Sequence, residues 1–272
     1  MVVGTIKVII FGAGGMLGSD LCKVFNDAIS FTRNEVDITN RQLMAAVLRE
    51  NMPDIVINAA AFTNVNRAEE ESELAFEVNG YAPGYIAEEC SQIGSKLIHY
   101  STDYVFDGTK QEYIESDNTN PINVYGRSKL LGEQQIASKT DDFIIIRTSW
   151  LFGLNGGNFV KTMLELSEKM DTVKVVNDQF GKPTYTADLA NKTLEIINLE
   201  SGIYHITNEG ICSWYEFASE VIDNSSPCSS EEFVTKAKRP RYSVLKNTKT
   251  SSMRPWRESV QDYLKNLKEQ SK

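Results

Sequence analysis

A tyrosine and a lysine four residues apart, Tyr125 and Lys129, are the side chains best suited to proton chemistry in this chain. Residues at i and i+4 share one face of a helix, and the apolar pair Leu130 and Leu131 favours a helix here. A phenol with an ordinary pKa of about 10 is a poor acid at neutral pH. A neighbouring ammonium favours the phenolate, so we expect Lys129 to lower the pKa of Tyr125 and make Tyr125 the proton donor to a substrate carbonyl. The alternative is a surface lysine beside an aromatic ring.

Three polar residues, Ser101, Thr102 and Asp103, follow directly after an apolar run at residues 96–100. If that run is a strand of a parallel sheet, these side chains lie at its carboxyl end, where such sheets bind ligands. We expect Thr102 to hydrogen-bond both a substrate carbonyl oxygen and Tyr125. The alternative is a capping hydroxyl at a turn.

Four glycines, Gly12, Gly14, Gly15 and Gly18, follow the first apolar run. The spacing 12, 15, 18 is GxxGxxG, whereas GxGxxG fails because position 17 is Leu17. A glycine turn lets the backbone approach a pyrophosphate, and the next helix presents unpaired N–H groups to it. The sequence therefore predicts a dinucleotide site, although glycines also serve tight packing alone.

The second predicted strand decides between the two nicotinamide dinucleotides. An acid at its end binds the ribose 2′-hydroxyl of NADH, and an arginine accommodates the 2′-phosphate of NADPH. Residues 30–34 read Ser-Phe-Thr-Arg-Asn, without an acid. We therefore expect Arg33 to favour NADPH. The alternative is that Arg33 is simply a solvated residue of the loop. Asp37 could still contact the adenosine ribose.

The elements that must position these residues alternate between short β-branched runs and longer amphipathic segments. This pattern predicts an α/β fold, a Rossmann-like doubly wound parallel sheet. The strands are expected at residues 6–11, 28–32, 55–59, 96–100, 143–147, 173–176 and 203–206. Thr39 and Gln42 have capping-box spacing before one helix, and Pro83 should interrupt a long helix over residues 70–93.

Periodicity weakens after Gly210, which predicts a second, smaller α/β lobe. We assign residues 1–152, with returning segments at about 172–208, to an NAD(P)-binding Rossmann domain. Residues at about 153–171 and 209–272 then form a substrate-binding lobe.

Composition limits the partners of the 272-residue chain. With 28 Lys and Arg against 37 Asp and Glu, the net charge is −9, which argues against an extended nucleic-acid surface. No apolar run approaches the roughly 20 residues of a membrane span, and no signal peptide is recognisable. Four scattered cysteines indicate neither a zinc site nor a disulfide framework, so we expect no metal ligands and a cytoplasmic protein.

Several further segments carry a resemblance to a known family. They are residues 57–65, 101–108, 121–126, 147–150 and 178–184, with more similarity at 213–217 and 254–257. Together with the glycine loop and the Tyr-Lys pair, they resemble the extended short-chain dehydrogenase/reductases and, within these, the dTDP-4-dehydrorhamnose reductases. The resemblance covers nearly the whole chain.

The resemblance implies reduction of the C4 ketone of dTDP-4-dehydro-β-L-rhamnose to dTDP-β-L-rhamnose, with NADPH or NADH. It implies that Tyr125 donates the proton, Lys129 tunes it and holds the nicotinamide ribose, and Thr102 polarises the C4 oxygen. The implied cofactor residues are Gly15, Met16 and Leu17 of the glycine loop, then Asp37, Ile38, Ala61, Phe62, Thr63 and Tyr100. The implied sugar residues are Thr63, Val65, Thr102, Asp103, Tyr104 and Trp150, whose indole is suited to stacking on a sugar. In the basic stretch of the second lobe, Arg239 or Arg241 is a candidate for the diphosphate.

Gram-negative members of the family can use a carboxylate-bound metal at a dimer interface. No residue pattern here supports Mg²⁺, so a structural cation stays open, and the chain is expected to be a monomer or a homodimer. Two other functions remain open. The first is a nucleotide-sugar epimerase or dehydratase with tightly bound NAD, although dehydratases carry an Asp-Glu pair where Asp103 is followed by Tyr104. The second is a non-catalytic regulatory subunit, related to that of methionine adenosyltransferase, which the retained Thr102, Tyr125 and Lys129 argue against.

Overall fold

Six parallel strands form the central sheet, and a computed structural model describes residues 6–270 of the chain. The strands are β1 (Val8–Phe11), β2 (Ile29–Phe31), β3 (Ile55–Asn58), β4 (Lys96–Thr102), β5 (Phe143–Thr148) and β10 (Gly202–His205). They lie in the order β10-β5-β4-β3-β1-β2, and each neighbouring pair is parallel. The isoleucine and valine runs fit this arrangement because strands covered on both faces need apolar side chains at successive positions. The predicted doubly wound α/β fold is confirmed.

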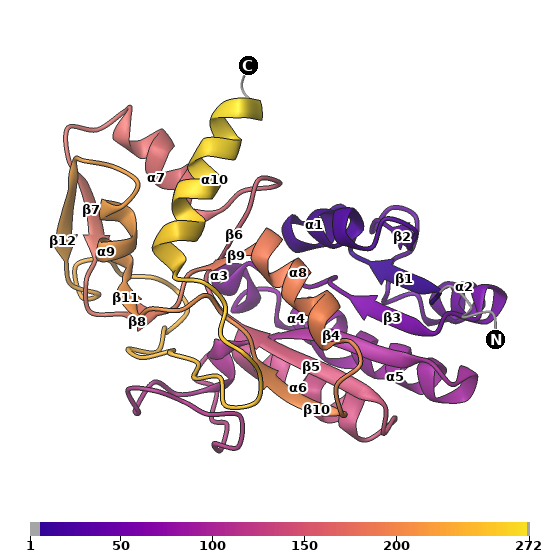
Figure 1. Cartoon of the computed structure of the whole chain (residues 1–272). Helices are drawn as coiled ribbons and strands as arrows, with labels where there is room; N and C mark the ends of the chain where they lie inside the picture. The colour runs from indigo at the N-terminus through magenta and orange to yellow at the C-terminus, as the bar shows by residue number, and fades with distance from the viewer. Residues whose placement is uncertain (1–5, 271–272) are drawn as a thin grey trace.

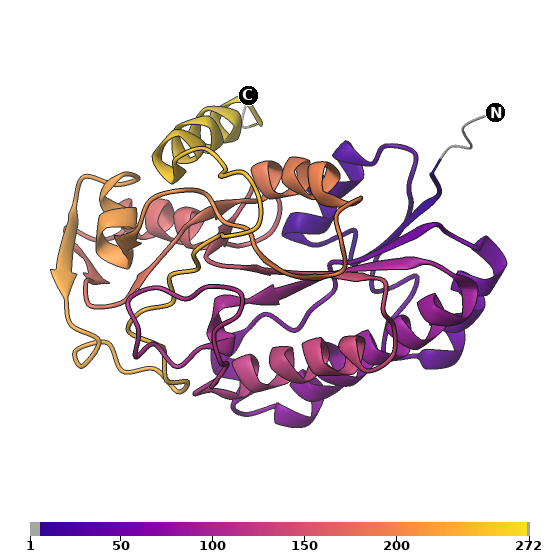
Figure 2. The same cartoon turned by 60° about the horizontal axis from the view of Figure 1, so that its bottom comes forward.

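Helices cover both faces of the sheet (Figure 2). On one face lie α1 (Met16–Val24) and α8 (Thr186–Ile196), and on the other lie α2 (Arg41–Asn51), α5 (Ala82–Ile93) and α6 (Val124–Ala137). Strand β1 shows the alternation that this requires. Val8 and Ile10 pack with α1 and α8, whereas Ile9 and Phe11 pack with α2 and α5. A separate hydrophobic core therefore stabilises each face.

The strand order reverses between β1 and β3, because the chain runs from β1 outward to β2 and then returns to β3 on the other side. In such sheets the crevice at the carboxyl ends of the two strands is the usual ligand site. Gly12 follows β1 and Ala60 follows β3, and a Cβ at Gly12 would lie 2.5 Å from the Ala60 backbone nitrogen. The turn after β1 therefore approaches β3 at a distance that only glycine permits.

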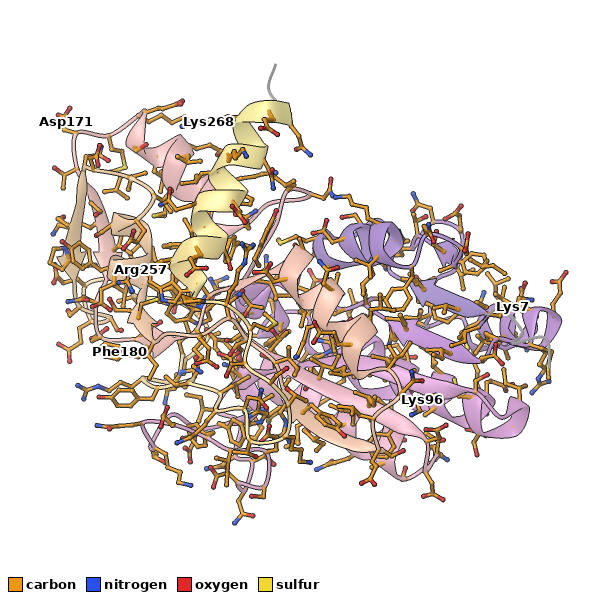
Figure 3. All side chains as sticks on the ribbon, viewed as in Figure 1. Lys7, Lys96, Asp171, Phe180, Arg257 and Lys268 are labelled. Atoms are coloured by element: carbon orange, nitrogen blue, oxygen red, sulfur yellow. The ribbon has the colours of Figure 1, made fainter. Side chains whose placement is uncertain are left out.

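A smaller lobe lies beyond the carboxyl ends of the strands (Figure 1). It contains α7 (Phe159–Ser167), α9 (Trp214–Ser219) and α10 (Trp256–Gln270), and three two-stranded sheets connect its segments. These pair β6 (Leu151–Phe152) with β9 (Thr184–Tyr185), β7 (Val173–Val176) with β12 (Ser225–Cys228), and β8 (Phe180–Gly181) with β11 (Cys212–Ser213). Figure 3 labels Phe180 and Asp171 in this lobe and Lys96, the start of β4, on the side away from it. The lobe therefore faces the carboxyl ends of the central strands.

Residues 173–176 form a strand as predicted, but their assignment to the central sheet is wrong. Strand β7 pairs with β12, and its burial alternates, with Val173 and Val175 buried and Lys174 exposed. A strand covered by helices on both faces has no place for that exposed lysine. The other six predicted strands form the central sheet, with ends shifted by one or two residues.

Two helix predictions have different outcomes. The helix after Thr39 begins one residue later than expected, because the side chain of Asn40 accepts from the Leu43 backbone nitrogen, while the Thr39 hydroxyl donates to Asp37 at 2.7 Å. The predicted interruption near Pro83 is confirmed. The predicted long helix is present, since α4 (Ser72–Phe76), a π-helical turn (Glu77–Tyr81) and α5 follow one another with no non-helical residue between them, and the interruption is a change of hydrogen-bonding register just before Pro83.

The structure also contains α3 (Val65–Ala68) and a 3₁₀ turn (Asp103–Val105). Within residues 6–270, no helix is both long and apolar enough to cross a membrane. The first five and last two residues of the two predicted domains lie outside the described residues.

Candidate active site

The start of α6 holds Tyr125 beside the end of β4. Asn123 caps the helix by accepting from the Gly126 backbone nitrogen at 2.7 Å, and Glu69 accepts from the Val124 backbone nitrogen at 2.8 Å. A Cβ at position 126 would lie 2.1 Å from the Tyr104 carbonyl oxygen, so glycine is required for this approach. Tyr125 is thereby fixed in the first turn of α6.

Thr102 ends β4 and lies next to Tyr125. Its hydroxyl accepts from the Tyr104 backbone nitrogen at 3.1 Å, donates to Asp103 Oδ1 at 3.0 Å, and also interacts with the Tyr125 phenol. The rings of Tyr104 and Tyr125 meet edge to face, 6.1 Å apart. The structure therefore brings Thr102, Asp103, Tyr104 and Tyr125 into one site.

The expected lowering of the Tyr125 pKa is wrong for this structure. Burial raises the pKa of Tyr125 to about 12; the hydrogen bond with Thr102 opposes the rise, and the Asp103 charge adds to it. The phenol is therefore protonated at neutral pH, as a proton donor must be. Burial of the phenol, which the sequence does not reveal, is the largest cause of this shift.

Lys129 is buried on the same face of α6, with an exposed fraction of 2%. Its Nζ donates to the Tyr100 carbonyl oxygen at 2.5 Å and lies 3.3 Å from His99 Nε2. Burial lowers the pKa of Lys129 to about 8, although the charge of Glu133 on the next turn raises it. The lysine is therefore close to losing its proton in the neutral to mildly alkaline range.

Asp103 is the second buried acid–base group of the site. Burial raises the pKa of Asp103 to about 7, although Ser243 and Thr102 hydrogen-bond its charged form. Within the described chain its Oδ2 has no hydrogen-bond partner. A buried carboxyl oxygen without a partner is suited to a polar ligand.

The glycine loop presents the start of α1 to the crevice. Gly15 is the N-cap of α1, no side chain caps the helix, and its first turn carries no acid. Gly14 and Gly15 are exposed and Met16 is half-buried, whereas the Leu17 side chain and Gly18 are buried. The free end of α1 fits the pyrophosphate of a dinucleotide, which backbone N–H groups and the helix dipole stabilise.

The loop after β2 holds Arg33 and Asp37 together. Arg33 is exposed, and its Nε lies 3.3 Å from Asp37 Oδ2. Glu35, which sequence reasoning missed, folds back so that its carboxylate accepts from the Thr32 backbone nitrogen and hydroxyl, both at 2.8 Å. An acid therefore does lie at the end of β2. The Thr32-x-x-Glu35 spacing, which matches that of a capping box, was the signal for it.

The segment after β3 carries Ala61, Phe62, Thr63 and Val65. Asn79 of the π-helical turn holds this segment, accepting from the Phe62 backbone nitrogen at 2.8 Å and donating to the Phe62 carbonyl at 2.9 Å. The Phe62 side chain packs in the same cluster as Tyr125. Asn79 is a second residue that sequence reasoning missed, and no local pattern marks it.

Two predicted cofactor residues have side chains in the core. Tyr100 is buried, and its hydroxyl lies 2.8 Å from Thr193 Oγ1 on α8, so only its carbonyl faces Lys129. Ile38 is buried among the residues under α2. Any contact of these residues with a cofactor would come from their backbone.

Trp150 lies between two neighbours. The Trp214 ring stacks on it at 3.6 Å and 8°. A Cβ on Gly181 would lie 2.4 Å from Trp150 Cε2 and 2.7 Å from both Nε1 and Cζ2, so Gly181 packs closely against this part of the indole. Trp214 therefore covers one face of the indole, and stacking of a sugar on that face would require Trp214 to move. The Trp150 backbone has a φ of 48°, and its Nε1 has no partner within the described chain.

Arg239 lies at the same edge of the site. Its Nη1 donates to Thr235 Oγ1 at 2.6 Å and to Asn66 Oδ1 on α3 at 3.2 Å. Burial raises the pKa of Tyr104, and Arg239 partly opposes this rise. Arg239 is therefore the cation placed beside the predicted sugar residues.

Across residues 6–270, no group of three or more His, Cys, Asp or Glu side chains is arranged to hold a metal ion.

Comparisons with known proteins agree on one family. The family model for the RmlD substrate binding domain matches residues 6–269. The spore coat polysaccharide biosynthesis protein SpsK of Bacillus subtilis is 42% identical, over 95% of this chain and 96% of its own. The dTDP-4-dehydrorhamnose reductase of Aggregatibacter actinomycetemcomitans is 39% identical, over 89% and 91%.

A solved structure is equally similar. It is the dTDP-4-dehydrorhamnose reductase of Bacillus anthracis in complex with NADP, with a TM-score of 0.93, 38% identity and coverage of 96% of this chain and 99% of that one. The family match extends across both lobes, and the relatives are similar over nearly their full lengths. The chain therefore belongs to the dTDP-4-dehydrorhamnose reductase family of oxidoreductases.

Proposed function

We propose that this protein reduces the C4 ketone of dTDP-4-dehydro-β-L-rhamnose to dTDP-β-L-rhamnose, a precursor of cell-surface polysaccharide, with NADPH. The observation that carries the proposal is the grouping of Thr102, Tyr125 and Lys129 at the carboxyl end of β4, beside the crevice onto which the glycine loop opens. The names of the similar proteins support the same reaction.

In the proposed mechanism each protein group has one task. When bound, NADPH supplies the hydride. Tyr125 is protonated at neutral pH and donates its proton to the C4 oxygen as the negative charge develops there. The Tyr104 backbone N–H fixes the Thr102 oxygen, so Thr102 can turn its single proton from Asp103 toward the C4 oxygen. The ammonium of Lys129 stabilises the resulting phenolate.

We propose that Arg33 gives preference for NADPH, while Glu35 and Asp37 provide acceptors for the ribose hydroxyls of NADH as the alternative cofactor. Arg33→Ala should raise the KM for NADPH about tenfold, the value of one charge-assisted hydrogen bond, and leave the KM for NADH unchanged. Arg41→Ala is the control because this arginine contacts Glu88 outside the loop. An unchanged ratio of the two KM values would exclude a role for Arg33.

The finer assignments are proposals as well. The Rossmann domain, residues 1–152 with the later segments that carry α8 and β10, binds the cofactor at the glycine loop, Ala61, Phe62 and Thr63. The smaller lobe, now including β7, frames the sugar together with Val65, Tyr104 and Trp150 of the Rossmann domain, while Arg239 of the smaller lobe pairs with the diphosphate. We propose a cytoplasmic monomer or homodimer that needs no metal.

The product identifies the function. The purified chain is incubated with NADPH and dTDP-4-dehydro-β-L-rhamnose formed in situ, and NADPH absorbance and the C4 configuration of the product sugar are measured. Formation of dTDP-β-L-rhamnose is the expected result. A product of the other C4 configuration would indicate a different nucleotide-sugar ketoreductase. Absence of turnover would favour the regulatory subunit, and NAD retained through gel filtration would favour the epimerase or dehydratase.

A further inference from the structure

A chain of buried polar groups runs beneath the site from β3 to α6. Asn58 on β3, His99 on β4 and Lys129 on α6 have exposed fractions of 0%, 1% and 2%. Asn58 Nδ2 lies 3.2 Å from His99 Nδ1, and His99 Nε2 lies 3.3 Å from Lys129 Nζ. Both nitrogens of the imidazole therefore face another nitrogen.

The orientation of the Asn58 amide is fixed by a further hydrogen bond. Its Oδ1 accepts from the Ala60 backbone nitrogen at 3.1 Å, so its Nδ2 must face the ring. Burial and the Lys129 charge lower the pKa of His99 well below its ordinary value. The ring is therefore neutral, with one N–H donor and one acceptor.

A neutral ring cannot accept from both neighbours at once. When Lys129 is an ammonium, it donates to Nε2, and the ring proton sits on Nδ1, where it opposes the Asn58 N–H. When Lys129 is a neutral amine, the proton sits on Nε2 and is donated to Lys129 Nζ, while Nδ1 accepts from Asn58. Only the second state pairs every donor with an acceptor, so Asn58 favours the loss of the Lys129 proton.

We propose that Asn58 and His99 are positioning residues for Lys129, and that the tautomer of His99 follows the protonation state of that lysine. The two states differ by one proton, which passes to solvent, and no electron moves. Neither residue touches the reacting atoms. They act by setting how firmly Lys129 holds the proton that stabilises the Tyr125 phenolate.

The other charged groups near Lys129 do not replace this control. Glu133, one turn along α6, favours the ammonium, but its carboxylate is already bound by Arg147 on β5 at 2.9 and 2.6 Å and by Ser101 on β4 at 2.5 Å. Tyr125 precedes Lys129 by one turn and is protonated. His99 is the ring in direct contact with the ammonium.

The chain has only two histidines, His99 and His205, which makes a direct test practicable. The full chain is labelled with ¹⁵N-histidine, the signals are assigned with His205→Gln, and two-bond ¹H–¹⁵N spectra distinguish the tautomers from pH 6 to 10. We expect His99 to change from the Nδ1–H to the Nε2–H form with a midpoint near the Lys129 pKa of about 8. In Lys129→Met it should stay Nε2–H at every pH.

Asn58→Asp supplies the second test, since a carboxylate accepts from Nδ1–H and removes the conflict. His99 should then stay Nδ1–H, and the alkaline limb of the kcat/KM profile should move upward by about one pH unit. Asn191→Asp on α8, an exposed change of the same charge, should alter neither readout.

A tautomer that is constant with pH in the native chain, or a switch that persists in Lys129→Met, would overturn the proposal. The effect on kcat/KM rests on the proposed role of Lys129, whereas the tautomer is measured without substrate. A switch without turnover would therefore count against the proposed function alone.

Discussion

Two aspartates only four residues apart show how local surroundings set the chemistry of this site. Asp103 is buried, and burial raises its pKa to about 7. Asp107 accepts from the Thr109 backbone nitrogen and hydroxyl and from the Tyr113 hydroxyl, and these hydrogen bonds hold its pKa well below the usual range. Asp103 is therefore suited to hold a proton near neutral pH, whereas Asp107 stays ionised and accepts structural hydrogen bonds.

The raised pKa of Asp103 makes a prediction for stability. The folded state binds this proton more tightly than the unfolded state, whose carboxyl has a pKa of about 3.9, so the free energy of unfolding should fall as pH rises toward 7. Asp103→Asn lacks this loss. Between pH 5 and 8, urea unfolding should show the variant gaining about 2 to 3 kcal/mol relative to the native chain.

Asp171→Asn, on the surface of the smaller lobe (Figure 3), is the control and should show no such trend. A constant difference between Asp103→Asn and the native chain across this pH range would contradict the raised pKa.

At the residue scale, the sequence predicted which side chains lie together, but it predicted the wrong direction for the shift of the Tyr125 pKa. The spacing of Tyr125 and Lys129, and the place of Thr102 after a strand, follow from helix and sheet periodicity. The direction of the Tyr125 pKa shift depends on burial against residues of α3 and α4, which no local pattern encodes. Contacts between segments distant in the sequence therefore set the direction of this pKa shift, which residue spacing alone does not determine.

Among the elements, the π-helical turn Glu77–Tyr81 has the clearest consequence for the site. It directs Asn79 inward, where its side chain also donates to Ser128 Oγ on α6 at 3.1 Å. Asn79 thus joins the segment after β3 to the helix that carries Tyr125. Pro83 predicted that the helix is interrupted, but the shift of hydrogen-bonding register that defines a π turn has no signature in the residues themselves.

Asn79→Ala tests this link. Removing the buried amide leaves the Phe62 backbone N–H and carbonyl without these partners, and Ser128 loses one of its two hydrogen bonds, so the free energy of unfolding should fall by about 1 to 3 kcal/mol. The Phe62 segment should also loosen and weaken NADPH binding about tenfold, a loss of about 1.4 kcal/mol measured by calorimetry.

Asn191→Ala removes an exposed amide that donates to the Ala187 carbonyl and should change neither quantity appreciably. NADPH affinity that is unchanged in Asn79→Ala would show that the π turn does not position the cofactor segment.

For the whole molecule, one carboxylate joins the two lobes. Asp188 on α8 accepts from Arg254 at 2.9 and 2.8 Å, from Ser259 on α10 at 2.6 Å and from Asn208 at 2.9 Å. The C-terminal helix is thereby fixed to a helix that covers the central sheet. The lobes were predicted from the loss of periodicity after Gly210, whereas this link between distant segments was not.

Arg254→Ala should therefore lower the free energy of unfolding by about 1 to 2 kcal/mol, a modest value because the side chain is one-third exposed. Arg257→Ala, on α10, removes a more exposed pair with Glu220 and should cost less than about 1 kcal/mol. Equal losses in thermal or urea unfolding would argue against the Asp188 link.

The exposed Lys174 marks the limit of prediction at this scale. It distinguishes β7 from the central strands, but only once one knows that both faces of the sheet are covered. Strand type follows from residue composition, whereas the sheet that a short strand joins depends on the path of the chain between the lobes.

The central claim is that Tyr125 donates the proton in a ketone reduction assisted by Thr102 and Lys129. The most direct measurement is steady-state NADPH oxidation with dTDP-4-dehydro-β-L-rhamnose by the native chain and by Tyr125→Phe, with NADPH affinity measured in both. We predict turnover by the native chain and a fall in kcat of about 10² to 10⁴-fold in the variant, at nearly unchanged NADPH affinity. Equal turnover by the two proteins would contradict the account.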